Sequence, residues 1–460
     1  MPTATTHHPA SYRDPSGFIF EKDGVLYRQV HLVFKEHFDR FIQSGCYDSL
    51  TKKGLLVSHG VIQENLSGSS EHYVTLQPEK ISFISYPYEW SFDMLKDAAL
   101  LTLQLLKEAL AFDMILKDAT PYNIQWHKGK LVFIDTLSFE KYEETPWIAY
   151  RQFCECFLGL LLIMHYSKKQ LPGLMLSWPE GIPLDIVAAL IPKRSRFSLY
   201  TYLHIHLHAR YAGKDNKKDS TTNKFSKQKL LNLAGSLESL ISKLKTPAQK
   251  STWSGYYEEA AQRNDYLEQK RKIVAEWVQE MAGIHTVADL GANEGEFSRI
   301  LATKDIPVVA ADFDPYCVNN LYRQIKNNKE RYILPLVLDL SNPSPAIGVS
   351  NEERPSFIGR SGFDLVLALA LIHHLAIGKN IPLDKIAAMF SRVGRQLIIE
   401  FVPKEDEKVQ LMLQRKKDIY RQYDEVNFVK AFEHYFIREK KEMIGSGGRT
   451  LWLFKRRELE

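Results

Sequence analysis

Cysteine is scarce in this sequence, and long apolar runs are missing. Four cysteines among 460 residues cannot build a disulfide scaffold, and such low usage is typical of a reducing compartment. The most apolar stretch, Phe157 to Met164, is far shorter than the roughly 20 residues that a membrane-spanning helix needs. The N-terminal residues also lack the apolar core of a secretory signal. We therefore expect a cytoplasmic protein without a membrane segment.

The sequence also has little net charge. Its 60 Lys and Arg residues and 55 Asp and Glu residues leave a formal net charge of +5, which is too small for this length to indicate a nucleic-acid partner. Hydrophobic residues make up 45% and charged residues 25%, so a disordered, collagen-like or coiled-coil chain is excluded. At typical domain sizes of about 100–200 residues, the length predicts two or three domains.

A change in composition divides the chain. Residues 213–228 are rich in Lys, Asp, Ser, Thr and Asn, as in a solvated linker. Apolar residues at helical spacing then predict an amphipathic helix over 230–244. The predicted parts are a lead-in over 1–14, a first domain over 15–210, a linker and helix over 211–251, and a second domain over 252–460.

Short apolar strands alternate with helices in the second domain. The strands are nearly unbroken runs of Val, Ile, Leu and Ala, as in buried parallel sheets. Their alternation with helices predicts a doubly wound, Rossmann-like α/β fold. The predicted strands are 286–290, 308–312, 333–338, 363–369 and 396–401, with 450–454 closing the sheet, and the predicted helices are 265–281, 296–301 and 315–327.

A glycine turn follows the first of these strands. Asp289 ends the strand, and Gly291, Asn293 and Gly295 follow it. The glycines allow a ligand to approach the backbone closely. Their spacing, G-x-x-x-G, departs from the dinucleotide motif G-x-G-x-x-G. The turn therefore suits an amino-acid tail better than a pyrophosphate.

Acidic residues end the next two strands. Asp312 lies about 20 residues after Gly291, a spacing at which an acid can accept hydrogen bonds from ribose hydroxyls. Phe313 follows it and is a candidate to pack on an adenine face. Asp339 ends the third strand, where its side chain or the backbone amide of Leu340 could bind the adenine amine.

In order and spacing, these motifs resemble the class I S-adenosylmethionine (SAM)-dependent methyltransferases. The resemblance covers roughly residues 265–456, includes the strand from Phe363 to Val366, and implies SAM as the cofactor. The cofactor contacts it implies are Asp289 at the methionine end with Gly291, Asn293 and Gly295, Asp312 at the ribose, and Asp339 at the adenine. The alternative is another Rossmann-like binder, such as half of a dehydrogenase.

Candidate catalytic residues stand at the carboxyl ends of two strands, where open α/β sheets bind ligands. His373 and His374 follow the fourth strand, and Glu400 ends the fifth. A histidine or a glutamate there could act as a general base toward an amine or a hydroxyl. Alternatively, the histidines only fix the loop under the cofactor. Because no third ligand follows from the spacing, we predict no metal site.

The first domain carries motifs of another kind. Asp118 and Asn123 are followed by a predicted hairpin and then by Asp135. This order resembles the protein-kinase-like fold, in which H-R-D-x-x-x-x-N precedes a hairpin and D-F-G. The resemblance implies an α+β domain in which Asp118 is the base, and Asn123 and Asp135 hold the Mg²⁺ of Mg-ATP.

The same domain departs from the kinase pattern. Lys117 stands where kinases have arginine, Asp135-Thr136-Leu137 replaces D-F-G, and neither a glycine-rich loop nor the nucleotide-binding lysine can be assigned. We therefore interpret it as a degenerate, pseudokinase-like domain. The alternative is an accessory domain that recognises substrate, with Asp118 and Asn123 as turn and cap residues.

Nearly the whole chain resembles a bacterial family of two-part SAM-dependent methyltransferases, some of them labelled nodulation proteins, through residues 86–90, 116–119, 133–140 and 339–346. The resemblance implies methylation of an oxygen or nitrogen on a small molecule or saccharide. A bifunctional protein with a nucleotide-binding or phosphotransfer domain is one alternative, and a non-catalytic SAM-binding scaffold is another. A macromolecular acceptor is also open, and the sequence does not predict the oligomeric state.

Overall fold

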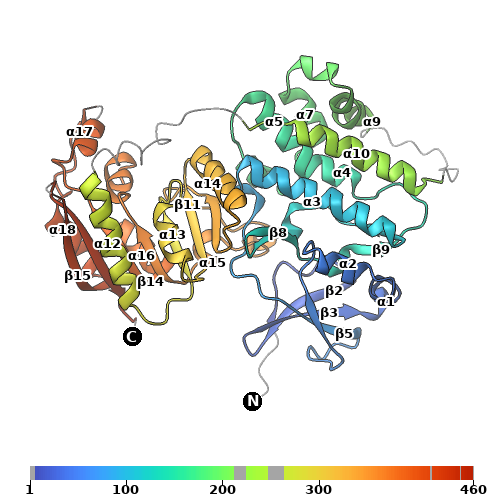
Figure 1. The fold of residues 1–460 in the computed structure, drawn as a ribbon, viewed down its shortest axis with the longest axis horizontal. Helices are drawn as coiled ribbons and strands as arrows, with labels where there is room; N and C mark the ends of the chain where they lie inside the picture. The colour runs from blue at the N-terminus through green and yellow to red at the C-terminus, as the bar shows by residue number, and fades with distance from the viewer. Residues whose placement is uncertain (1–5, 212–223, 247–263, 415–416, 446, 459–460) are drawn as a thin grey trace. The chain divides into compact units, whose positions relative to one another are not determined.

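The computed structural model describes residues 6–211, 224–246, 264–414, 417–445 and 447–458. The chain divides into two compact units (Figure 1): residues 1–248 with 347–354, and residues 249–346 with 355–460. The predicted linker over 211–251 lies partly outside the described residues. Its described helix, α10 (Lys227–Lys243), packs against α3 (Phe92–Ala111) of the first unit.

An antiparallel sheet opens the first unit. Its five strands have the order β1-β2-β3-β5-β4. The hairpin β2–β3 turns at Asp23 and Gly24, which both have positive φ, as a type I′ turn requires. The strands are β1 (Thr6–His7), β2 (Gly17–Lys22), β3 (Val25–His31), β4 (His59–Ile62) and β5 (His72–Pro78), and the helices that follow the hairpin are α1 (Lys35–Gln43) and α2 (Cys46–Lys52).

Most of the remaining first unit is helical. Helix α3 is buried along its length because apolar residues recur at helical spacing. Two short antiparallel pairs follow it, β6 (Met114–Leu116) with β9 (Phe139–Lys141) and β7 (Ile124–His127) with β8 (Lys130–Phe133). The small sheet followed by a helical part confirms the predicted α+β kinase-like arrangement. The later helices are α4 (Tyr150–Phe153), α5 (Gly159–Ser167), α6 (Leu174–Ser177), α7 (Leu184–Leu190), α8 (Leu199–Thr201) and α9 (His208–Tyr211).

A twisted sheet forms the centre of the second unit. Its seven strands have the order β12-β11-β10-β13-β14-β16-β15. The first five of these are parallel, whereas β16 runs antiparallel to both of its neighbours. This order confirms the doubly wound, Rossmann-like fold. The strands are β10 (Val287–Leu290), β11 (Val308–Asp312), β12 (Ile333–Val337), β13 (Phe363–Ala368), β14 (Gly394–Phe401), β15 (Phe436–Ile444) and β16 (Arg449–Arg456).

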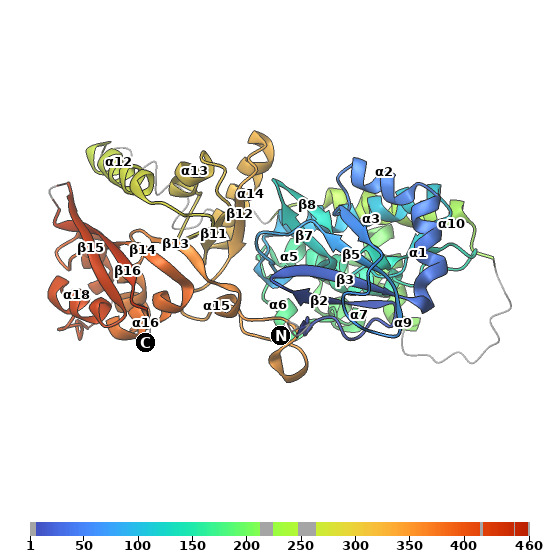
Figure 2. The same ribbon diagram turned by 90° about the horizontal axis from the view of Figure 1, so that it is seen from below.

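Helices cover both faces of this sheet. Figure 2 shows α12, α13 and α14 on one face and α16 and α18 on the other. Helix α14 begins at Pro315 after Asp314, whose side chain accepts a hydrogen bond from the amide of Tyr316, so its start is capped. The helices are α12 (Asn264–Glu280), α13 (Glu296–Ala302), α14 (Pro315–Asn328), α15 (Phe357–Arg360), α16 (Leu383–Val393), α17 (Glu407–Leu413) and α18 (Glu425–Glu433).

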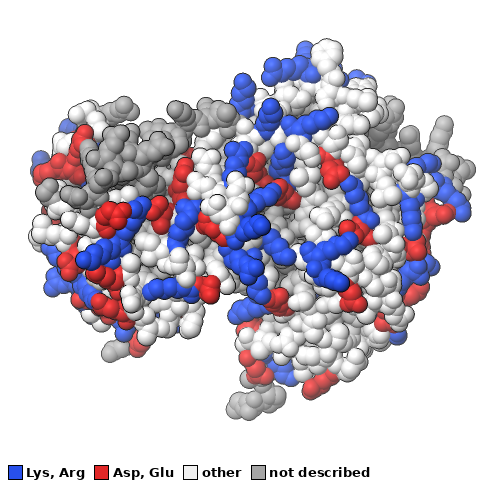
Figure 3. All heavy atoms as spheres, in the orientation of Figure 1, with Lys and Arg blue, Asp and Glu red and all other residues white. Residues whose placement is uncertain are grey.

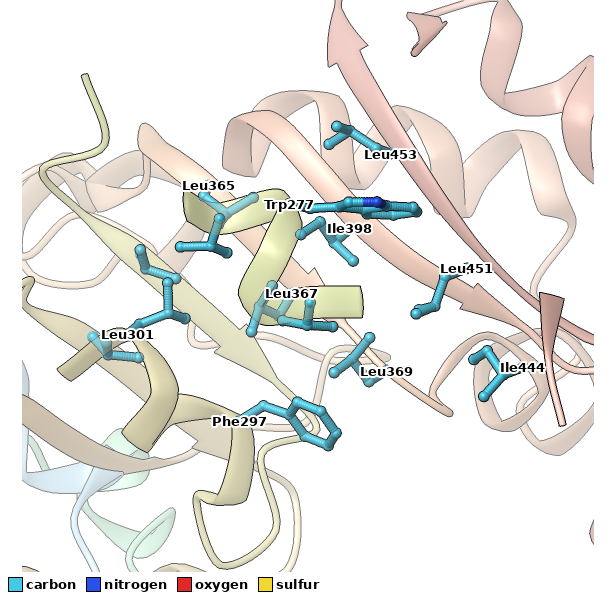
Figure 4. Packing of buried hydrophobic residues seen from close by; sticks show 14 of the residues in the cluster. Trp277, Phe297, Leu301, Leu365, Leu367, Leu369, Ile398, Ile444, Leu451 and Leu453 are labelled. Atoms are coloured by element: carbon cyan, nitrogen blue, oxygen red, sulfur yellow. The ribbon is translucent and has the colours of Figure 1, made fainter. Parts of the chain in front are cut away.

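One core of the second unit lies between its sheet and the helices α12 and α13 (Figure 4). Leu367 and Ile398 project from neighbouring strands toward Trp277 and Phe297 of these helices. This packing fixes the carboxyl ends of β10 and β13, which border the candidate site.

Both charge signs are represented on the visible surface, where Lys and Arg side chains lie among Asp and Glu side chains (Figure 3). Such mixing agrees with the small net charge. Among the helices that the structure describes, none combines the length and the apolar character needed to cross a bilayer.

Truncation of the core should destabilise the second unit selectively. Leu367 is fully buried, so Leu367→Ala should lower the free energy of unfolding by about 2–5 kcal/mol. The exposed Val426 supplies the control, since Val426→Ala should change it by less than about 0.5 kcal/mol. Denaturant titrations of both variants measure the difference, and equal effects would contradict this account of the core.

Candidate active site

The second unit contains a cavity of about 610 Å³ at the carboxyl ends of its parallel strands. Its walls come from the loops after β10, β11, β12 and β13, together with residues of α12 and α17. Open α/β sheets bind ligands at this edge. The candidate residues among its walls are Asp289, Gly291, Asn293, Asp312, Phe313, Asp339, Leu340, His373 and His374.

The glycine turn after β10 forms the floor of the site. Gly291 and Gly295 have φ of 82° and 77°, conformations that other residues rarely adopt. A Cβ atom on Gly295 would lie 2.7 Å from Cδ1 of Leu321. Backbone conformation and the lack of space both favour glycine at position 295. Gly295 shapes the turn but is not part of the cavity wall.

Asp289 brings a buried carboxylate to this turn. It is 3% exposed, and Oδ2 accepts a hydrogen bond of 2.7 Å from Oγ of Ser298 in α13. Burial raises the pKa of Asp289 to about 6, and the nearby charge of Asp312 adds to this effect. A group that carries positive charge or donates hydrogen bonds would offset the cost of ionising it here.

Asp312 is the second buried carboxylate. Oδ2 accepts a hydrogen bond of 2.8 Å from the amide of Asn293, and Oδ1 accepts one of 2.9 Å from the amide of Asp314. Burial nevertheless raises the pKa of Asp312 to about 6. Each oxygen has a further lone pair, so the carboxylate can still accept two hydroxyl groups of a ligand.

The adenine-side candidates line the same cavity. Phe313 is 53% exposed, so its ring is accessible to a ligand. Asp339 accepts hydrogen bonds from the amide and the hydroxyl of Ser341 and pairs with Lys379 at 3.3 Å. Burial alone would raise the pKa of Asp339, but these partners outweigh it and lower the pKa.

His373 and His374 lie in contact, with ring centroids 4.1 Å apart. Both line the cavity. Burial lowers the pKa of His373 well below its usual range, with His374 adding to the shift, and burial followed by the charge of Arg449 lowers the pKa of His374 to about 4. Both rings are therefore neutral at pH 7. Among the described residues, Nδ1 of His373 has no hydrogen-bond partner.

Glu400 is fully buried in a cluster of charges beside the cavity. Its Oε2 pairs with Nζ of Lys270 at 2.8 Å, and its Oε1 pairs with Nη1 of Arg449 at 3.1 Å. The hydroxyl of Tyr266 also donates to Oε1. Nε of Arg449 in turn pairs with Asp406 at 2.8 Å. Lys270 and Arg449 line the cavity, whereas Glu400 does not.

The partners of Glu400 determine its charge state. Burial alone would raise its pKa, but the charges of Lys270 and Arg449 and two hydrogen bonds hold the pKa at about 2. The carboxylate is thus ionised and already paired at neutral pH. This geometry suits a group that positions Lys270 and Arg449.

Sequence reasoning did not single out Lys270, Arg449 or Lys379. Lys270 lies in an amphipathic helix and Arg449 opens the last strand, so both are far in sequence from the glycine turn. No local spacing indicates that such residues meet. The only sequence signals for these residues were that Lys270 is a basic residue in the helix before the first strand and that Arg449 follows the final glycine-rich turn.

The three kinase-like candidates of the first unit also lie together. Nδ2 of Asn123 donates to Oδ2 of Asp118 at 3.1 Å. Burial raises the pKa of Asp118, and the charge of Asp135 adds to the effect. Asp135 itself pairs with Nη1 of Arg28 at 2.6 Å. Among the residues that the structure describes, no group of three His, Cys, Asp or Glu side chains is arranged to hold a metal ion.

The strand order of the second unit, its glycine turn and the acids at the carboxyl ends of β10, β11 and β12 define a class I SAM-dependent methyltransferase. No family model matches the chain. The sequence is 35% identical over 472 aligned residues to the nodulation protein NoeA of Rhizobium meliloti (strain 1021), covering 97% of this chain and 96% of that protein. The chain belongs to the NoeA family.

Solved structures resemble parts of the chain. Magnesium protoporphyrin IX methyltransferase from Synechocystis PCC 6803, with bound SAH, is 17% identical, with 46% of this chain and 89% of that chain covered and a TM-score of 0.32. The bifunctional kinase-methyltransferase WbdD is 19% identical, with 42% and 39% covered and a TM-score of 0.29. N-methyltransferase NodS from Bradyrhizobium japonicum WM9 is 11% identical, with 42% and 98% covered and a TM-score of 0.32. Likeness at this level does not indicate a substrate.

Removing the charge of Glu400 should destabilise the second unit. Glu400→Gln leaves Lys270 and Arg449 buried without their shared anion, which should cost about 3–5 kcal/mol at pH 7. Because the folded-state pKa of Glu400 is lowered to about 2, its contribution is complete above the unfolded pKa. In the wild type this contribution is lost as the pH falls from about 4.5 toward 2.

Denaturant titrations at pH 7 measure this effect. The exposed Glu439 provides the control, since Glu439→Gln should leave the free energy of unfolding nearly unchanged. If Glu400→Gln were as stable as Glu439→Gln, the cluster would not hold this wall of the cavity together.

Proposed function

We propose that this protein transfers a methyl group from SAM to an oxygen or nitrogen atom of a small molecule or saccharide. The observation that supports it most is the pair of buried carboxylates, Asp289 and Asp312, on either side of the glycine turn in the cavity. SAM carries an ammonium group, a sulfonium and two ribose hydroxyls. The protein's own donors to these carboxylates do not offset their burial, and SAM would bring further positive charge and donors.

The same pair of carboxylates disfavours the alternative of a dinucleotide cofactor. A pyrophosphate at the glycine turn would place negative charge beside Asp289, which already has a raised pKa from burial. Like charges in a buried site repel strongly. The methionine end of SAM instead brings an ammonium group to this carboxylate.

We propose for the cofactor residues the roles that the methyltransferase resemblance implies, because these residues meet at one cavity. Asp289 and Asn293 hold the methionine end, and Asp312 accepts the ribose hydroxyls. Phe313 and Leu340 border the adenine, and Asp339 lies where the adenine amine would be bound. Gly291 and Gly295 give the turn its shape.

In methyl transfer the protein mainly has to hold the acceptor atom in line with the methyl group, because the sulfonium supplies a good leaving group. His373 and His374 are neutral and can each accept a hydrogen bond from the acceptor's hydroxyl or amine. We propose that one of them orients the acceptor by accepting this hydrogen bond. Glu400 is engaged by Lys270 and Arg449, so we propose for it a positioning role.

The cavity wall also contains apolar and polar groups that the cofactor assignment does not use. Leu371, Leu411 and Met412 lie in its wall together with Lys408 and Gln414. A small molecule or saccharide, with apolar faces and hydroxyl or amine groups, suits such a wall. Turnover of any such acceptor would exclude the alternative of a non-catalytic SAM-binding scaffold.

Cofactor binding can be tested with S-adenosylhomocysteine (SAH). At 100 times its dissociation constant, SAH should stabilise the wild type by about 2.7 kcal/mol, seen as a rise in melting temperature. Asp312→Asn should lose this rise, because it removes the charge that accepts the ribose hydroxyls. Asp384→Asn, an exposed change at the start of α16, should keep it. Full stabilisation of Asp312→Asn would refute the site.

SAH affinity should also depend on pH. Because the pKa values of Asp289 and Asp312 are raised to about 6, both carboxylates are ionised at pH 7.5 and largely protonated at pH 5. A protonated carboxyl binds an ammonium or a pair of hydroxyls poorly. Affinity should fall by about tenfold per carboxylate at one pH unit below its pKa. Titration calorimetry between pH 5 and 7.5 measures this, and a flat profile would contradict it.

A transfer assay completes the test of function. Tritiated SAM is incubated with sets of hydroxyl- and amine-bearing metabolites and saccharides, and label in the product is counted. Asp312→Asn serves as the inactive control and Asp384→Asn as the active one. Label transferred equally by Asp312→Asn would show that another site performs the reaction.

A further inference from the structure

Groups of the protein already bind both oxygens of the Asp135 carboxylate. Oδ1 receives Nη1 of Arg28 at 2.6 Å and the amide of Leu137 at 3.2 Å. Oδ2 receives the hydroxyl of Ser138. Mg²⁺ needs oxygen ligands in near-octahedral geometry with free lone pairs directed at it. With a guanidinium and two further donors on it, this carboxylate has few lone pairs left for a metal ion.

Arg28 is held in this position by the sheet. It lies in the middle of β3, paired in register with Ile19 of β2 and Leu76 of β5. Its side chain is only 12% exposed, and that of Asp135 is 13% exposed. A second carboxylate, Asp14, lies 3.8 Å from Nη2 of Arg28. The guanidinium is permanently charged and can bond carboxylates through several N–H groups.

The other kinase-like groups are engaged as well. Asp118 accepts hydrogen bonds from the amide of Thr120 at 3.1 Å and from Nδ2 of Asn123 at 3.1 Å. Nζ of Lys117 donates to Ser16 at 3.0 Å and pairs with Glu140 at 3.4 Å. Asp118 and Asn123 thus satisfy one another and the turn between them, as in an Asx-type turn.

We propose that the guanidinium of Arg28 stands in the position that a kinase gives to its metal ion, so that the first unit does not bind Mg-ATP. The charged crevice then holds the unit together through internal pairs. The first unit is a pseudokinase whose cation is part of the chain. This inference concerns the first unit alone and is independent of the SAM site.

The residues implied by the kinase resemblance therefore lie together without forming the site that the resemblance implies. The fold brings these residues together. Their contacts differ from those of a kinase because an arginine replaces the metal ion. A side-chain cation cannot dissociate from the protein as Mg²⁺ does, and it cannot be coordinated by phosphate and carboxylate oxygens. Phosphotransfer at this crevice would need Arg28 to leave Asp135.

The test uses the full-length protein with Mg²⁺ alone, ATP alone and both at millimolar concentration, followed by thermal unfolding and calorimetry. The wild type should show no Mg²⁺-dependent ATP binding. Arg28→Met should melt lower than Arg40→Met, an exposed change in α1 of the same unit. Added Mn²⁺ should raise the melting temperature of Arg28→Met by more than about 2 °C and leave the wild type unchanged, because the vacated position accepts a cation.

Two results would overturn the proposal. One is Mg²⁺-dependent ATP binding by the wild type that Asp135→Asn abolishes. The other is an Arg28→Met variant that melts like Arg40→Met and does not respond to Mn²⁺. If Arg28→Met fails to fold, the wild-type titration and Arg28→Lys, which retains a positive charge, still decide: both should lack Mg²⁺-dependent ATP binding. Because SAH binds to the second unit, the folding check for each variant is the cooperative thermal transition of the first unit together with the far-ultraviolet circular dichroism spectrum.

Discussion

The site in the second unit depends on the burial of two carboxylates at the ends of neighbouring parallel strands. Asp289 and Asp312 have too few donors in the protein to offset their loss of solvent, and their pKa values are raised accordingly. The sheet supplies the constraint, because β10 and β11 pair in register and bring the two side chains to one edge. A ligand that binds there must bring positive charge and hydroxyl donors. That requirement, rather than any single motif, selects SAM over a pyrophosphate-bearing cofactor.

Two other buried carboxylates of the chain are paired with basic side chains of the protein. Glu400 has Lys270 and Arg449, and Asp135 has Arg28. Both are paired by permanent charges of the protein, so neither is available to a ligand in the way that Asp289 and Asp312 are. Burial is similar in the four cases. The difference between a binding group and a structural group lies in which partner offsets the burial.

Local patterns in the sequence predicted much of the fold. Unbroken apolar runs predicted β10, β11, β12 and β13, since strands buried on both faces have few polar residues. The strand β15 was not predicted because its centre, residues 438–442, is an unbroken run of charged residues at the edge of the sheet. The pairs Glu400–Lys270 and Asp135–Arg28 were also beyond prediction, because each joins residues far apart in sequence. The cofactor candidates could be predicted because each one lies at or just after the end of a predicted strand. The partner of a buried charge has no such local signal.

The central claim is that the pair Asp289 and Asp312 binds the cofactor in the cavity of the second unit. A crystal structure of the full chain grown with SAH tests it most directly. The account predicts electron density for SAH in this cavity, with the ribose hydroxyls on Asp312 and the amino group near Asp289. SAH bound elsewhere, or these two carboxylates turned away from it, would contradict the account.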